Sequence, residues 1–324
     1  FNIAQYWRAE NAEDRKVIRA LSTPGLLTEA ERAVGQYTDG NDYSVEGDLR
    51  RAPFSTYILK TKRPGFMVCY FGALDEEEHK SGPYSPQAFA VLEKLDSIIG
   101  RIRSAAVESG GGHAFVCVVS DHGFMRTDKE VNLNSALRQA GLIEVDEKGS
   151  VKSWRAFAWY AGGSAGIMVR DRSDEAARKK ATEVMIGLVS NQSSGVDRII
   201  YPSAIPSPGG FPDSAFVVTL KPGYRLGTKL QGPVTLAALP GGTHGYAPDV
   251  VDMNSSFFII GPGIGAHQDL GQIDMRDIAP TLAGLMGLEL PAAEGHDLKV
   301  SLKALFTGPA TMANGTAQPA TGAR

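Results

Sequence analysis

Three short stretches of the sequence contain the side chains that could do chemistry. They are Asp75 to His79, Asp121 to Gly123, and Gly241 to Gly245. Together they supply two carboxylates and three imidazoles, although the whole chain has only six histidines. Mixed oxygen and nitrogen ligands suit zinc, with manganese or iron as lesser options. These stretches therefore predict a metal site.

Five candidate ligands exceed what one catalytic zinc ion needs, because such an ion usually takes three protein ligands and keeps a position open. Five ligands fit two divalent metal ions, each with an open position for a substrate. Each stretch taken alone is also typical of a surface ion pair, a turn or a flexible loop that binds no metal. Taken together and in this order they favour a common site. The predicted ligands are Asp75, His79, Asp121, His122 and His244.

The flanking residues predict the elements that must position these groups. Phe66 to Phe71 and Ala114 to Val119 are continuous apolar runs, typical of strands buried on both faces of a sheet. Between them, apolar residues recur at helical spacing after Ser85, an expected N-cap followed by Pro86. Strand, helix and strand in this order predict a βαβ unit, and hence a parallel sheet covered by helices. Ligands bind outside the carboxyl ends of such strands, where the first two stretches lie.

The other elements are expected to be helices and short strands. Residues 1–63 are predicted to be mainly helical, with Thr28 as an N-cap. Further helices are expected from Asn134, as N-cap, to Gln139 and from Asp277 to Met286. Phe257 to Ile260 is expected to be a strand. The third ligand stretch precedes that strand, so a loop must bring it to the other two.

Changes in composition and in the helix, strand and turn signals divide the chain into four predicted parts. Residues 1–143 are predicted as the first part of an α/β core, and residues 144–240 as an inserted lid or cap subdomain with one helix from Ser173 to Val189. Residues 241–306 are predicted as the second part of the core, and residues 307–324 as a disordered tail. The predicted fold class is therefore α/β, with a parallel-rich sheet flanked by helices.

Composition excludes some classes of partner. The net charge is -3 in 324 residues, so no excess of positive charge indicates binding to a nucleic-acid polymer or an anionic membrane. The longest apolar runs are too short to span a bilayer. Cys69 and Cys117 lie in apolar runs and are expected to be buried free thiols, although a disulfide between them stays open. Nothing in the sequence defines the oligomeric state.

The motifs resemble those of the type I phosphodiesterase/nucleotide pyrophosphatase family, which belongs to the alkaline phosphatase superfamily. Asp75 to Pro83 is similar to the family's Asp-x-x-x-His-x-x-Gly-Pro signature, and Val119 to Phe124 resembles its Ser-Asp-His-Gly motif. Thr243 to Gly263 resembles its third block, and Asp277 to Gly287 its closing helix. The resemblance extends from about Gly65 to Leu298.

The resemblance implies an alkaline-phosphatase-like fold and a two-metal phosphoester hydrolase that acts through a covalent phospho-enzyme. Asp75, His79 and His244 would hold one ion, expected to be zinc, while Asp121 and His122 would help to hold the other. The substrate would be a small phosphoester such as a nucleotide. An exported or periplasmic location is also implied. Candidate substrate contacts are Asn132, Tyr246 and Trp159.

The family's nucleophile, a threonine or serine at a helix N-terminus, is expected ahead of the first motif, together with an aspartate for the second ion. Within residues 1–63 the one faint candidate is Thr23-Pro24, which no apolar strand ending in Asp-Gly precedes. The prediction is therefore that the nucleophile lies upstream of Phe1, that the sequence is a fragment, and that this fragment alone is inactive.

Two alternatives stay open. One is another hydrolase of the same superfamily, such as a phosphatase, a phosphonoacetate hydrolase or a sulfatase, or a phosphomutase, although Gly82-Pro83 favours the diesterase branch. The other, should the chain be complete, is a metal-binding protein without catalytic activity.

Overall fold

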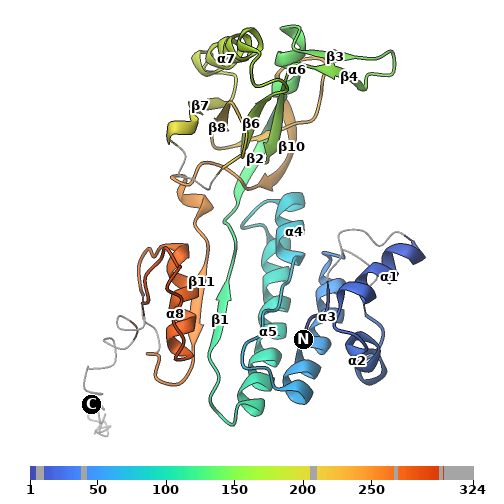
Figure 1. The fold of residues 1–324 in the computed structure, drawn as a ribbon, viewed down its shortest axis with the longest axis vertical. Coiled ribbons are helices and arrows are strands. Elements are labelled where there is room, and N and C mark those ends of the chain that lie inside the picture. Colours follow the sequence, from blue (N-terminus) through green and yellow to red (C-terminus); the bar gives the residue numbers. More distant parts are fainter. Residues whose placement is uncertain (5–10, 38–41, 205–209, 266–268, 299–301, 303–324) are drawn as a thin grey trace, which may run out of the picture. The chain divides into compact units, whose positions relative to one another are not determined.

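A computed structural model describes residues 1–4, 11–37, 42–204, 210–265, 269–298 and 302. It contains α-helices and several small sheets (Figure 1). Contacts divide the chain into two compact units. The first unit comprises residues 1–112 and 119–256, and the second comprises residues 113–118 and 257–324. The predicted tail at residues 307–324 lies outside the described residues.

The first unit begins with helices, and all but the one at Ala73–Ser81 were predicted. They are α1 (Ala12–Leu21), α2 (Leu26–Val34), α3 (Val45–Lys62), α4 (Ala73–Ser81) and α5 (Pro86–Ser109).

The starts of α5 and α2 test two predicted N-caps. Ser85 caps α5, since its hydroxyl oxygen accepts a hydrogen bond from the backbone N–H of Ala88 at 3.1 Å. The prediction that Thr28 caps a helix is wrong, because α2 already begins at Leu26. A turn closed by the Leu26 N–H and the Thr23 carbonyl starts this helix, and Gly25 takes the left-handed conformation (φ 78°) that the turn requires.

Two small apolar cores hold these helices together. One is formed by Ile18, Leu27, Ala30 and Phe54, from α1, α2 and α3. The other joins α3, α4 and α5 through the buried side chains of Ala52, Ala73, Val91, Leu95 and Ile98.

The prediction of a strand at Phe66 to Phe71 is wrong. No described strand pairs with this segment, and strand structure requires the hydrogen bonds of a neighbour. Its odd and even side chains differ in burial: Met67, Cys69 and Phe71 are half-buried, whereas Phe66, Val68 and Tyr70 are 59%, 75% and 53% exposed. The expected βαβ unit is therefore not formed in the described residues.

A three-stranded sheet, in the order β10-β2-β9, follows in the first unit. It consists of β2 (Met125–Val131), β9 (Tyr224–Leu226) and β10 (Thr235–Thr243). Strands β2 and β10 are antiparallel with Met125 opposite Thr243, while β2 and β9 are parallel. Strands β3 (Ile143–Val145) and β4 (Val151–Trp154) form a separate antiparallel pair.

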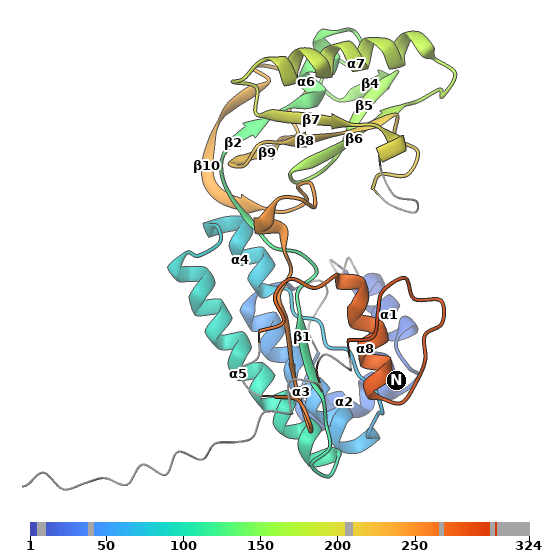
Figure 2. The ribbon, with the colours of Figure 1, turned by 90° about the vertical axis from the view of Figure 1, so that its left-hand side faces the viewer.

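A four-stranded antiparallel sheet with the order β5-β6-β8-β7 forms the largest core. Its strands are β5 (Ala156–Ala161), β6 (Ser164–Val169), β7 (Val196–Ile200) and β8 (Phe216–Leu220). Figure 2 shows α7 (Glu175–Ser190) running along one face of this sheet, and Ala177, Ala181 and Met185 bury its inner side. The helix predicted at Ser173 to Val189 is thus confirmed, while the predicted domain boundaries stay a prediction.

Helix α6 (Leu133–Gln139) is confirmed, but Asn134 is not its N-cap. Asn132 occupies the N-cap position, and Asn134 is buried in the first turn. The Asn134 amide accepts a hydrogen bond from the Ala158 N–H at 2.8 Å and donates one to the Ala158 carbonyl at 3.0 Å. This side chain joins α6 to β5, because a buried amide needs partners for both its donor and its acceptor.

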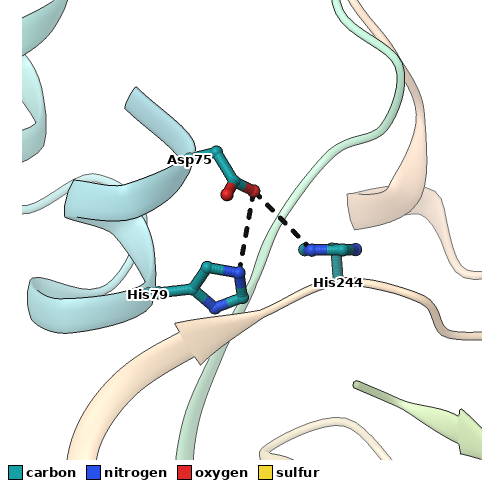
Figure 3. Close-up of side chains that lie close together, drawn as sticks. All are labelled: Asp75, His79 and His244. Carbon is teal, nitrogen blue, oxygen red and sulfur yellow. Dashed lines mark ion pairs between the residues drawn. The ribbon is translucent and has the colours of Figure 1, made fainter. Parts of the chain in front are cut away.

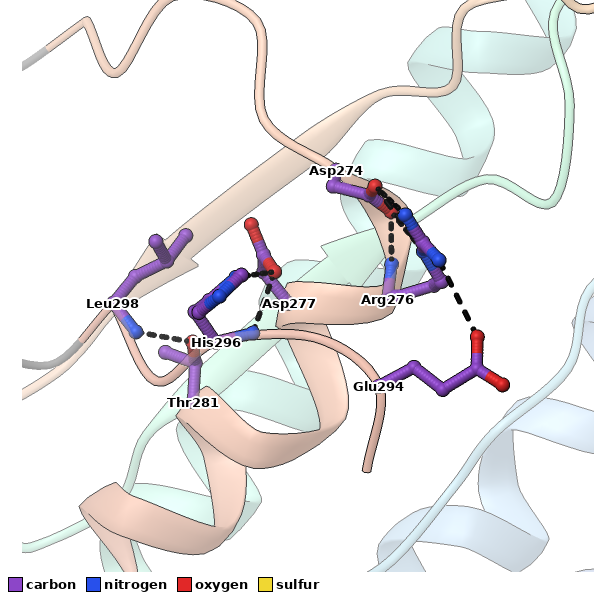
Figure 4. Close-up of polar contacts among 7 residues, drawn as sticks. All are labelled: Asp274, Arg276, Asp277, Thr281, Glu294, His296 and Leu298. Carbon is purple, nitrogen blue, oxygen red and sulfur yellow. Dashed lines mark hydrogen bonds and ion pairs between the residues drawn. The ribbon is translucent and has the colours of Figure 1, made fainter. Parts of the chain in front are cut away.

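The second unit contains β11 (Phe257–Ile260), its pairing partner β1 (Val116–Val119) except for the last residue, the short 3-10 helix η3 (Met275–Asp277) and α8 (Ile278–Leu285). The predicted strands and helix are confirmed, but the strands are only partly buried. The segment after α8 is tied back onto it (Figure 4). Asp277 accepts from the His296 N–H at 2.7 Å, and Thr281 accepts from the Leu298 N–H at 2.9 Å.

Two smaller predictions concern the membrane and the cysteines. None of the helices in the described residues has the length and apolar character that crossing a membrane requires. Cys69 and Cys117 are both free thiols, and both are half-buried.

Candidate metal centre

Asp75, His79 and His244 point toward one another (Figure 3). The Oδ1 atom of Asp75 lies 3.7 Å from Nε2 of His79 and 3.6 Å from Nε2 of His244. Their ligand atoms all lie within 4.8 Å of one another. The Nε2 atom of His122 is 3.9 Å from the same carboxylate oxygen. One oxygen atom is therefore surrounded by three imidazole nitrogens.

Helix α4 supplies Asp75 and His79, four residues apart and therefore on one face of the helix. The buried carboxylate of Asp48 on α3 accepts a hydrogen bond from the N–H of Ala73, the first residue of α4, at 2.9 Å. Its other oxygen pairs with the buried guanidinium of Arg51 at 2.6 Å. This arrangement fixes the N-terminus of α4, and with it the position of Asp75.

The ladder between β2 and β10 brings the two other histidines together. Thr243 is opposite Met125, so His244 follows the end of one strand while His122 lies three residues before the start of the other. The two imidazole rings stack with centroids 3.7 Å apart and an interplanar angle of 11°. The third ligand stretch therefore reaches the second through strand pairing.

Two glycines let α4 approach β10 closely. A Cβ atom at Gly241 would lie 2.7 Å from the carbonyl oxygen of His79, and one at Gly242 would lie 2.5 Å from that of Glu78. No side chain fits in this space, because real Cβ atoms do not approach an oxygen so closely. The absence of side chains at Gly241 and Gly242 is what allows His79 and His244 to meet.

Backbone carbonyls orient two of the imidazoles. Nδ1 of His79 lies 3.1 Å from the Gly242 carbonyl oxygen, and Nδ1 of His122 lies 3.1 Å from the Gly123 carbonyl oxygen. A carbonyl oxygen only accepts hydrogen bonds, so each Nδ1 is the donor and each Nε2 is the nitrogen that faces Asp75. This arrangement is common for histidines that bind metals through Nε2.

The environment of Asp75 Oδ1 fits a metal ion. This atom is buried and has no hydrogen-bond partner, and the imidazole nitrogens are too far away to serve as one. Ligand atoms at about 2.0–2.2 Å from a tetrahedral zinc ion lie roughly 3.3–3.6 Å apart, close to the separations around Asp75. An unsatisfied buried carboxylate oxygen is costly, and a cation between these groups would remove that cost.

The titration behaviour of the neighbouring groups follows from burial and charge. Burial, followed by the neighbouring imidazole of His122, lowers the pKa of His244. Burial, followed by the negative charge of Asp75, raises the pKa of Glu78. His244 is therefore a neutral imidazole at neutral pH, which is the form that binds metals.

Asp121 lies at the edge of this cluster. Its Oδ2 atom is 3.6 Å from Nε2 of His122, and its side chain is 75% exposed. All five predicted ligands are therefore neighbours, with Asp75, His79 and His244 as a compact triad. Asp121 and His122 form an adjacent pair, and their role as ligands to a second ion stays a prediction.

The three predicted substrate contacts differ in accessibility. Asn132 is fully buried, and its amide oxygen accepts from the Lys229 N–H at 2.8 Å. Tyr246 is buried, and its hydroxyl donates to the Tyr224 carbonyl. Both residues therefore have packing roles in this structure. Trp159 on β5 is 67% exposed, so it alone of the three has free surface for a ligand.

Phe124, which directly follows the second ligand stretch, packs against the histidines of the site. Its buried ring meets the His79 ring edge-on at 4.8 Å and the His244 ring at 5.4 Å. The aromatic ring thus packs against two of the predicted ligands.

Comparison with solved structures shows an alkaline-phosphatase-like α/β fold. Human ectonucleotide pyrophosphatase/phosphodiesterase 5 matches with a TM-score of 0.60 and 16% sequence identity over 84% of this chain and 66% of that one. An inactive threonine-to-alanine variant of the murine protein, in complex with AMP, matches with a TM-score of 0.59 and the same identity and coverage. The chain therefore spans just under two thirds of these relatives.

A family model assigns the chain more directly. The model for type I phosphodiesterase/nucleotide pyrophosphatase matches residues 5–247, which include all five predicted metal ligands. The sequence motifs, the α/β fold and this match agree with one another. The chain belongs to the type I phosphodiesterase/nucleotide pyrophosphatase family.

Proposed function

We propose that this chain provides the metal centre of a two-metal phosphodiesterase or nucleotide pyrophosphatase. The single observation that carries the proposal is the buried Oδ1 atom of Asp75, which lacks a hydrogen-bond partner and faces three imidazole nitrogens at 3.6–3.9 Å. Asp75, His79 and His244 would hold one zinc ion, and Asp121 and His122 would help to hold a second.

The residues of the chain prepare this site for phosphoryl transfer. Bound divalent ions neutralise charge on the transferring phosphoryl group and lower the pKa of water and hydroxyl groups. His79 and His122 keep their Nε2 atoms directed inward through their Nδ1 contacts to backbone carbonyls. His244 is kept neutral by burial and by its neighbours, so it does not need to lose a proton before it binds metal.

The proposed nucleophile is a threonine or serine hydroxyl that this sequence does not include. Its oxygen would form a bond to phosphorus while the bond from phosphorus to the leaving oxygen breaks, and water would then hydrolyse the phospho-enzyme. The inactive threonine-to-alanine variant of the murine relative supports a threonine. The segment from Phe66 to Phe71 pairs with no described strand, so its backbone edges are open to an additional strand.

The proposed substrate is a nucleotide-like phosphoester. The murine relative is in complex with AMP, which is consistent with a nucleotide. Trp159 offers an exposed aromatic ring on which a base could stack, an interaction worth about 1–3 kcal/mol.

The experiment that tests this proposal is hydrolysis of bis-p-nitrophenyl phosphate with zinc present. It compares the 324-residue chain with a chain extended at its N-terminus by the upstream coding sequence. The expected result is activity in the extended chain alone, lost in its His244→Ala and Asp121→Ala variants. Unchanged activity in both variants would contradict the site. Zinc binding without hydrolysis in either chain would favour a metal-binding protein that lacks catalytic activity.

A further inference from the structure

The two-residue turn Gly162–Gly163, between β5 and β6, packs directly on the loop that carries His244. The Gly163 N–H donates to the His244 carbonyl oxygen at 2.8 Å. The hydroxyl of Ser164 donates to the Gly245 carbonyl oxygen at 2.6 Å. Two successive peptide groups of the His244 loop are thus hydrogen-bonded to one turn of the four-stranded sheet.

Close packing reinforces these hydrogen bonds. A Cβ atom at Gly162 would collide with the His244 carbonyl oxygen and lie 2.7 Å from Oγ1 of Thr243. A Cβ atom at Gly163 would collide with the ring of Tyr246, and one at Gly245 with the Ala161 carbonyl oxygen. The turn and the loop therefore fit together only because neither presents a side chain at these three points.

The turn is itself held from the other side. Its Gly162 carbonyl accepts from the Leu226 N–H on β9, and its Gly163 carbonyl accepts from the Leu220 N–H on β8, both at 2.9 Å. These bonds connect the turn to strands whose side chains belong to the largest apolar core. The position of the turn, and hence of the His244 backbone, is set by that core.

We propose that the β5–β6 turn is the element that positions His244 against Asp75, so that Gly162 and Ser164 are positioning residues of the metal centre. Neither residue contacts the proposed ion. The inference rests on the proposed metal site for its functional consequence, while its geometric part stands without metal. Supporting residues of this kind typically change metal affinity by about 10–100-fold.

The test uses the 324-residue chain and the variant Gly162→Ala, with Gly111→Ala as the matched control. Both glycines have left-handed backbones, with φ of 67° and 61°, but a Cβ atom at Gly111 meets nothing within 4 Å. The strain from a left-handed φ is therefore similar in the two variants, and contact with the His244 loop is the difference under test. Isothermal titration with zinc should show affinity about tenfold weaker or worse in Gly162→Ala than in Gly111→Ala. Equal affinities would overturn the inference.

A second variant, at Ser164, tests the same inference if Gly162→Ala does not fold. Ser164→Ala removes the hydrogen bond to Gly245 without adding an atom, and Ser164→Thr retains the hydroxyl. The expected result is a several-fold loss of zinc affinity in Ser164→Ala and recovery in Ser164→Thr. The same affinity in all three proteins would contradict a positioning role.

A metal-free measurement separates this inference from the proposed function. The stacked rings of His122 and His244 shift each other's proton resonances, so the imidazole NMR signals report their geometry without zinc. These signals should move in Gly162→Ala and stay in place in Gly111→Ala. If the wild-type chain binds no zinc but the signals move, the proposed function fails and the positioning role holds. If the signals do not move, the positioning role fails whatever zinc does.

Discussion

The imidazole rings of His122 and His244 stack with their centroids 3.7 Å apart and nearly parallel, at 11°. This contact is produced by the antiparallel ladder of β2 and β10, which ends where Met125 faces Thr243. Imidazoles that both stayed protonated at this distance would repel each other. Burial and then the neighbouring imidazole of His122 lower the pKa of His244, and the neutral ring is the form that metal ions bind.

Zinc should stabilise the chain through His244. At a free zinc concentration 100-fold above the dissociation constant, the free energy of unfolding should rise by about 2.7 kcal/mol, and a chelator should reverse the increase. The stabilisation should disappear in His244→Ala. The control is His113→Ala, which removes an exposed histidine outside the site. Thermal unfolding with and without zinc measures the effect. An equal zinc response in the two variants would show that His244 is not a ligand.

Gly242→Ala should destabilise the chain and weaken zinc binding. The added Cβ atom would lie 2.5 Å from the Glu78 carbonyl oxygen and 2.9 Å from the Phe124 ring, so α4 and β10 must separate. Overpacking of this kind costs about 1–3 kcal/mol. The comparison is Gly100→Ala, at an exposed helical position where a Cβ meets nothing within 4 Å; it should stabilise by about 0.5–1 kcal/mol. Urea unfolding should give a lower free energy of unfolding for Gly242→Ala and a higher one for Gly100→Ala than for the wild type. A change in the same direction in both variants would refute the close packing.

Asp48→Ala should destabilise the helical part of the chain by about 3–5 kcal/mol, because it removes the carboxylate that the buried Arg51 guanidinium contacts. It also removes the acceptor of the Ala73 N–H at the start of α4. The control is Lys60→Ala, which breaks an exposed ion pair with Glu108 and should cost at most about 1 kcal/mol. Denaturant unfolding measures both. Similar small losses in the two variants would indicate that the buried pair does not anchor α4.

Alkaline pH should destabilise the chain partly through Cys117. Burial raises the pKa of this thiol to about 11, whereas an unfolded chain has a value of about 8.5. Between these values the unfolded state binds fewer protons than the folded state, so the thiol's contribution to stability is present below about pH 8.5 and is lost as the pH rises toward 11. Cys117→Val should flatten this part of the pH profile of urea unfolding. An identical alkaline slope in wild type and variant would contradict the raised pKa.

Local sequence patterns predicted much of this molecule. Ser85-Pro86 marks the start of α5, and the helical spacing of the apolar residues after it predicted its course. Such features depend on neighbours in the chain, so a single sequence is enough to identify them. The grouping of the five candidate ligands was also predicted, from the order of the motifs.

Features that depend on distant partners could not be predicted in the same way. The apolar run at Phe66 to Phe71 was expected to be a buried strand, but a strand exists only with a neighbour, and no described strand pairs with it. Asn134 looked like an N-cap because its partner, the Ala158 backbone, lies on another strand. The approach of β10 to α4 depends on Gly241 and Gly242, which read equally well as part of a flexible loop.

The hydrogen bond between His79 and Gly242 links positions 163 residues apart. An ion held by His79 and His244 would therefore act as a cross-link over a very long loop of chain, in the way a disulfide does. The entropy lost when such a loop closes grows with its length, and binding supplies the free energy that offsets it. The helices around α4 and the strands around β10 would then unfold as one cooperative body with the ion bound, and less cooperatively once it is removed.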